Sequence, residues 1–128
     1  MSHKALIYSI SNSNIEFYKK SLNNLNCKLN VVYAFPDFER FLLNETPDLI
    51  VMDLELDNTD AITVIKEIKS HQLTTDPFII VCSPKSDDYI QISALNSGAD
   101  EFIDLPLNHL IFESKLKALF KRKQNGNT

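Results

Sequence analysis

Short runs of apolar residues, separated by longer amphipathic stretches, constrain the fold of this chain more than any other feature. Each run is rich in β-branched or aromatic residues and mostly lacks the alternation of a strand that has one face in water. Such runs are typical of parallel strands buried on both faces. The expected strands are Ala5–Ile10, Leu29–Tyr33, Leu49–Asp53, Phe78–Cys82 and Glu101–Ile103.

Between the runs, apolar residues recur at helical spacing, which predicts a helix after each strand. Ser13, with Glu16 three residues later, predicts a capping box at the start of the first helix, and Gly98 is expected to end the fourth in a left-handed conformation. Repeated βα units predict an α/β fold, an open parallel sheet with helices on both faces. The helical stripes are Ile15, Tyr18, Leu22 and Leu25; Phe38, Phe41 and Leu42; Ala61, Ile65 and Ile68; and Phe112, Leu116, Leu119 and Phe120.

The length of 128 residues suits one domain, expected over 1–123, with 124–128 as a tail or the start of a linker. No apolar run is long enough to cross a bilayer, and the start of the chain lacks a secretory cleavage site. We therefore expect no membrane contact and a cytoplasmic location. Cys27 and Cys82 are expected to be buried free thiols, which fits that compartment.

Charge and glycine content exclude several function classes. The net charge of −4 would repel a phosphate backbone, so direct nucleic-acid binding is not expected. With two glycines in the whole chain, neither a Walker phosphate loop nor a dinucleotide-binding fingerprint can be written. Nucleotide enzymes of those classes are excluded.

Asp53 ends the most apolar run, at the place where a parallel sheet forms its sites. Ligands of such sheets bind beyond the carboxyl ends of the strands. The same topology predicts that the loops Ser9–Ser13 and Cys82–Lys85 lie beside Asp53.

Two segments carry a resemblance to a known family. PDLIVMDLELDNTDAITVIKEIK and NSGADEFIDLPL resemble the receiver domains of bacterial two-component response regulators, and the likeness runs from about Lys4 to Arg122. It implies a flavodoxin-like, doubly wound five-stranded sheet of order 2-1-3-4-5 with five helices. It also implies that Asp53 is the phosphoacceptor. The other matching positions are Pro47, Asp48, Gly98, Ala99, Asp100, Phe102 and Pro106.

The site departs from that family at the positions that support phosphoryl transfer. The family's acidic pair, which holds Mg²⁺, falls on Ser9 and Ile10. The family's lysine, which stands just before the proline at position 106, is replaced by Leu105. The switch hydroxyl falls on Cys82, with Ser83 one residue later, and the switch aromatic falls on Phe102. A thiol is a weaker donor than a hydroxyl.

No cofactor is expected, and Mg²⁺ only if the ordinary receiver interpretation holds. Mg²⁺ commonly takes one or two carboxylates besides water, and Asp53 with Glu55 would be a weak pair of candidates. The interpretation is therefore a divergent pseudo-receiver that is not an enzyme and acts through protein contacts. In this interpretation Asp53 accepts hydrogen bonds from loop amides, with Ser9, Ser11 and Asn12 nearby.

Two alternatives stay open. In one, Asp53 is phosphorylated in an ordinary histidine-to-aspartate relay. In the other, the chain is a flavodoxin-like flavin binder that uses the hydroxyls of Ser9–Ser13 at a helix start, although no glycine stands there. A calcium loop beginning at Asp53 is disfavoured because Asn58 replaces the required glycine and Val64 the final glutamate.

The resemblance also implies partners. They are a sensor histidine kinase or another signalling protein, and an output domain on the C-terminal side in a longer chain, as the segment LKALFKR suggests. Homodimerisation is expected through the face made by the fourth helix, fifth strand and fifth helix. Tyr89, Ile90, Ile92 and Leu95 would supply part of that face, and the inner half of them is expected in the core.

Overall fold

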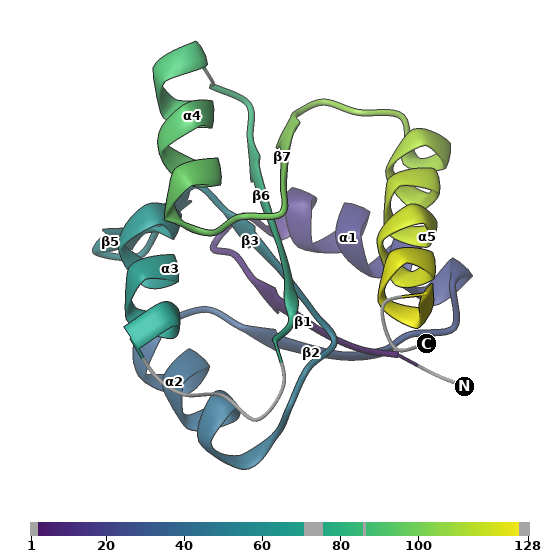
Figure 1. The fold of residues 1–128 in the computed structure, drawn as a ribbon, viewed down its shortest axis with the longest axis horizontal. Coiled ribbons are helices and arrows are strands. Elements are labelled where there is room, and N and C mark those ends of the chain that lie inside the picture. Colours follow the sequence, from purple (N-terminus) through teal and green to yellow (C-terminus); the bar gives the residue numbers. More distant parts are fainter. Residues whose placement is uncertain (1–2, 71–75, 86, 126–128) are drawn as a thin grey trace.

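The computed structural model, which describes residues 3–70, 76–85 and 87–125, contains a five-stranded parallel sheet between two layers of helices (Figure 1). The strand order β2-β1-β3-β6-β7 is the predicted order 2-1-3-4-5 in these labels, so the predicted fold class is confirmed. The strands are β1 (Lys4–Tyr8), β2 (Lys28–Val32), β3 (Leu49–Asp53), β6 (Phe78–Ser83) and β7 (Glu101–Asp104).

The helices divide between the two faces of the sheet. Figure 1 shows α1 and α5 on one side and α2, α3 and α4 on the other. Each face has its own apolar core, which explains the unbroken apolar runs: all five residues of β3 are buried. The helices are α1 (Asn12–Asn24), α2 (Phe35–Asn44), α3 (Ala61–Ser70), α4 (Asp88–Ser97) and α5 (His109–Asn125).

The segment after β3 forms a small hairpin that the sequence did not predict. Strands β4 (Glu55–Leu56) and β5 (Thr59–Asp60) pair antiparallel, and Asn58 turns the chain with φ of 60°. Asparagine tolerates this left-handed conformation better than most residues. Asp60 then accepts hydrogen bonds from the backbone N–H and the hydroxyl of Thr63, so it caps the start of α3.

One predicted helix start is corrected, and one predicted helix end is confirmed. The capping box at Ser13 is wrong: the extended residue is Ser11, whose hydroxyl accepts from the Asn14 backbone N–H, so α1 begins at Asn12. The helix end at Gly98 is confirmed, with φ of 127°. The last helix continues to Asn125.

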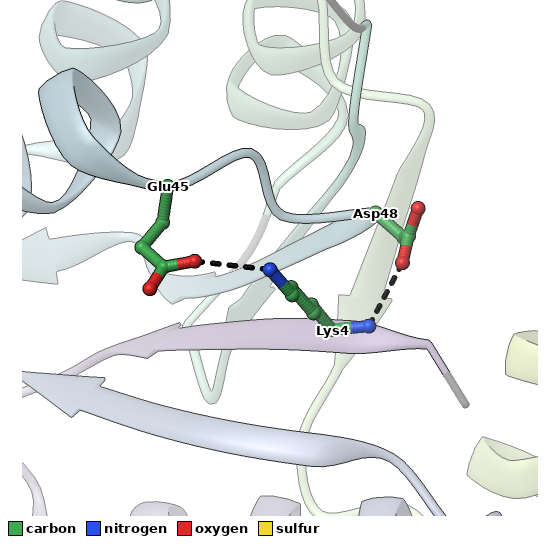
Figure 2. Close-up of polar contacts among 3 residues, drawn as sticks. All are labelled: Lys4, Glu45 and Asp48. Atoms are coloured by element: carbon green, nitrogen blue, oxygen red, sulfur yellow. Dashed lines mark hydrogen bonds and ion pairs between the residues drawn. The ribbon is translucent and has the colours of Figure 1, made fainter.

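At the amino ends of the strands, Asp48 fixes the register of β1 beside β3 (Figure 2). Its carboxylate accepts from the Lys4 backbone N–H at 2.8 Å, while its own N–H donates to the Lys4 carbonyl at 2.8 Å. The Lys4 ammonium reaches Glu45 at 3.0 Å. Asp48 therefore has a structural role at the end of the sheet opposite Asp53.

Helix α4 is anchored by few side chains. Ala94 is its buried residue, Ile90 is half-buried, and Tyr89, Ile92 and Leu95 are exposed. The expectation that the inner half of the four larger side chains would be core is wrong, because the small Ala94 is the residue that faces the sheet. Within the ranges that the structure describes, no helix has the length and apolar character needed to cross a membrane.

Candidate functional site

Asp53 ends β3 at the carboxyl edge of the sheet and is buried, with 6% of its surface exposed. Its register partner in β6 is Cys82, and the loop after β1 places the buried Ser9 beside it. The two predicted loops thus meet at this carboxylate. Ile10, next to Ser9, is 52% exposed and lines the same pocket as Asp53.

In the part of the chain that the structure describes, three side chains donate hydrogen bonds to Asp53. The hydroxyl of Tyr18 donates to Oδ1, and the hydroxyl of Ser9 donates to Oδ2. The Asn14 side-chain amide also donates to Oδ2, at 3.3 Å. The prediction of a hydrogen-bonded aspartate is right for Ser9, but loop amides are not the donors found here, and Ser11 caps α1 instead.

Tyr18 was predicted as a core residue and not as part of the site. It is fully buried on α1, one turn after Asn14, and its ring packs against Phe17 and Phe112. Burial, with Cys82 and Asp53 beside the hydroxyl, raises the pKa of Tyr18 above its ordinary value of 10.0. The hydroxyl therefore keeps its proton and acts as a donor to the carboxylate.

The switch positions do not offer a free hydroxyl to Asp53. Cys82 is fully buried, and burial is the main reason that its pKa is raised to about 12. The Ser83 hydroxyl donates to the Lys85 carbonyl at 2.8 Å and accepts from the Lys85 N–H at 3.0 Å, so it is committed to its own loop. The half-buried Phe102 packs into the core on the opposite face of the sheet, the face of α2, α3 and α4.

The lysine position of the family is apolar in this fold. The Leu105 backbone N–H continues the β6–β7 pairing by donating to the Ser83 carbonyl at 2.9 Å. Leu105 and Pro106 are joined by a cis peptide bond. Together with Phe17, they line a small apolar hollow. Among the described residues that line the Asp53 pocket, the cationic side chain is that of Lys85, which is exposed.

The donor set around Asp53 does not suit Mg²⁺. A hard cation binds through oxygen lone pairs, and both carboxylate oxygens of Asp53 already accept hydrogen bonds, from the hydroxyls of Ser9 and Tyr18. The second carboxylate of the pocket, Glu55, is exposed on the hairpin. Over residues 3–70, 76–85 and 87–125, no three side chains of His, Cys, Asp or Glu gather in a way that could hold a metal ion.

Comparison with known proteins gives a consistent family. Residues 11–115 match the response regulator receiver domain. Response regulator ArlR of Staphylococcus saprophyticus is 30% identical over 125 residues, covering 97% of this chain and 55% of ArlR. The phosphate regulon transcriptional regulatory protein PhoB of Pseudomonas aeruginosa is 31% identical over 87 residues, covering 68% of this chain and 38% of PhoB.

A solved structure of a response regulator is also similar to this chain. A two-component response regulator from Clostridium difficile is 26% identical and superposes with a TM-score of 0.86, covering 95% of this chain and 98% of that one. The chain spans about half the length of the curated relatives it matches.

Proposed function

We propose that this chain, which belongs to the response regulator receiver domain family, is an atypical receiver that signals through protein–protein contacts and responds weakly or not at all to phosphorylation. The observation that carries the proposal is the set of donors on Asp53. Both carboxylate oxygens are engaged by hydroxyls from Tyr18 and Ser9.

Phosphoryl transfer to an aspartate needs a carboxylate oxygen free to attack phosphorus and positive charge to balance the transferring group. Here the attacking oxygen would first have to leave a hydrogen bond to a buried hydroxyl. Hydrogen bonds to charged groups contribute about 1.5–3 kcal/mol each. The apolar Leu105 and the exposed Glu55 offer little to offset that cost.

The switch itself is also weakened. Moving a two-state protein from 1:99 to 99:1 requires about 5.5 kcal/mol of differential interaction. A phosphorylated Asp53 would meet the thiol of Cys82 and no lysine at position 105, so much of that interaction is missing. The domain would therefore signal through the conformation that it has without phosphorylation.

The proposal extends to partners and location. We assign to this chain a sensor histidine kinase or another signalling protein as its partner, in the cytoplasm. The receiver domain itself is proposed to span 1–123. A C-terminal output domain is proposed because the matched relatives are longer than this chain. Self-association is assigned to the face of α4, β7 and α5, where Tyr89, Ile92 and Leu110 are exposed.

The test is phosphorylation of the purified protein by acetyl phosphate with Mg²⁺, followed by intact mass measurement, with Asp53→Ala as the control. We expect no phosphate adduct in the wild type, or one that leaves the amide resonances of β6 and β7 unmoved. A single adduct in the wild type that is absent from Asp53→Ala, together with shifts in those strands on adding beryllofluoride and Mg²⁺, would restore the ordinary regulator function.

A further inference from the structure

A groove separates α2 from α3 on the face of the sheet opposite α1. Helices α1 and α5 close their side of the sheet with aromatic contacts, Phe17 to Phe112 at 5.2 Å and Tyr18 to Phe112 at 5.9 Å between ring centroids. Between α2 and α3 an apolar hollow remains open instead. Its lining residues are Phe35, Phe38, Glu39, Leu42, Leu43, Glu67 and Ile68.

The apolar floor of the groove comes from one face of α2. Phe35, Phe38, Leu42 and Leu43 lie at i, i+3, i+7 and i+8, the spacing of a helix stripe that packs against another element. Phe38 is buried against the sheet, yet Leu43 is 78% exposed. The apolar stripe of α2 is therefore only partly buried by the rest of the domain.

The charged side chains described along the groove are acidic. Glu39 and Glu67 line the apolar hollow, and the neighbouring hollow that continues it past Phe35 toward the β4–β5 hairpin adds Asp57. Among the described residues that line the two hollows, every charged side chain is a carboxylate. An apolar floor with an acidic rim is complementary to a guest with apolar and basic faces.

We propose that the groove between α2 and α3 is a docking site for a basic amphipathic helix of a partner protein. Both walls are helices of 10 residues, about 15 Å long, which fits a guest helix of two to three turns. Its apolar side chains would lie on Phe35, Leu42 and Leu43, and its lysines or arginines would face Glu39 and Glu67. This is helix-in-groove recognition, with opposite charges at the rim. The site is independent of Asp53.

The test uses a short synthetic helix of leucine and lysine with leucines at i, i+3, i+4 and i+7, and its counterpart with glutamate in place of lysine. We expect saturable one-to-one binding of the basic peptide to the whole chain, measured by calorimetry, and at least tenfold weaker binding of the acidic one. Leu43→Asp and Glu39→Lys should each weaken binding about tenfold or more.

Matched controls sit on exposed positions elsewhere: Ile111→Asp, at 50% exposure on α5, and Glu16→Lys on α1. They should leave the affinity unchanged. Equal binding of the acidic peptide, equal losses in the controls, or no binding would overturn the proposal. Dimerisation of the wild type that Leu43→Asp abolishes would overturn it too, since the groove would then hold a second copy of this chain.

Discussion

The hydroxyl of Tyr18 donates a hydrogen bond to Oδ1 of Asp53, which joins the middle of α1 to the end of β3 across 35 residues of sequence. The bond holds the carboxylate toward the protein interior. It also gives α1 a polar anchor on the sheet in addition to its apolar stripe.

Replacing Tyr18 with phenylalanine should lower the free energy of unfolding by about 1–3 kcal/mol. The ring and its contacts with Phe17 and Phe112 would remain, so the change isolates the hydroxyl. Urea denaturation measures the loss. The control is Tyr33→Phe, on an exposed residue, for which we expect a change below about 0.5 kcal/mol. Equal values for both variants would mean that the bond to Asp53 contributes nothing.

Magnesium at millimolar concentration should leave the Tm of the wild type unchanged, because a ligand stabilises only the state that binds it. Ile10→Asp combined with Tyr18→Phe would place a second carboxylate at the pocket and free Oδ1 of Asp53, so its Tm should rise with magnesium. Ile111→Asp with Tyr18→Phe is the matched control, since Ile111 is exposed to nearly the same extent on α5. Stabilisation of the wild type would show that the site at Asp53 binds magnesium without a second carboxylate.

The protein should lose stability as the pH rises above about 9. Burial raises the pKa of Cys82 to about 12 and that of Cys27 to about 11, while the unfolded chain releases these protons near 9.0. The folded state then holds protons that the unfolded state has lost, which lowers the unfolding free energy by about 1.4 kcal/mol per pH unit for each thiol. Urea midpoints between about pH 8 and about pH 11 measure this slope. The slope should be shallower in Cys27→Ala, and an unchanged slope there would exclude this thiol as a source.

Substituting Gly98 with alanine should destabilise the fold by about 1–2 kcal/mol. The φ of 127° disfavours any side chain, and an added Cβ would lie 3.2 Å from Ile65 Cγ2 and 2.6 Å from Lys69 Cε. The lysine can move, so most of the cost is in the backbone. Thermal unfolding of Gly98→Ala beside Ser97→Ala measures it. A loss in Ser97→Ala as large as that in Gly98→Ala would assign the effect to the end of α4 in general.

Self-association should depend on the exposed side of α4. We expect sedimentation velocity to show a concentration-dependent dimer in the wild type and a monomer in Ile92→Asp, because Ile92 is 57% exposed and a buried carboxylate there would lack a partner. Leu43→Asp, in the α2–α3 groove, should leave the dimer intact. Loss of the dimer in both variants would argue against this face as the specific contact.

The sheet could be predicted from the sequence because burial on both faces leaves its mark on the linear pattern. Leu49–Asp53 is apolar until its last residue, and that residue was correctly placed at the carboxyl edge. The hairpin at Asn58 was missed, since its two-residue strands are too short to leave a periodic signal.

The donors to Asp53 were only partly predictable. Ser9 was expected nearby because it follows a neighbouring strand. Tyr18 was assigned to the core from its helical spacing, and that spacing does not reveal where a phenolic oxygen points. The available signal was Asn14 one turn before Tyr18, which places two polar groups on the same side of α1, and both of them donate to Asp53.

Helix α4 is capped at its start by the Asp87 side chain, ends at Gly98, and has Ala94 as its buried residue. Little apolar surface is lost when such a helix opens locally, so its amides should exchange with solvent faster than those of β3, whose side chains are all buried. Thermal fluctuation alone can then supply alternative shapes at this face. A binding partner could select among them without any covalent signal.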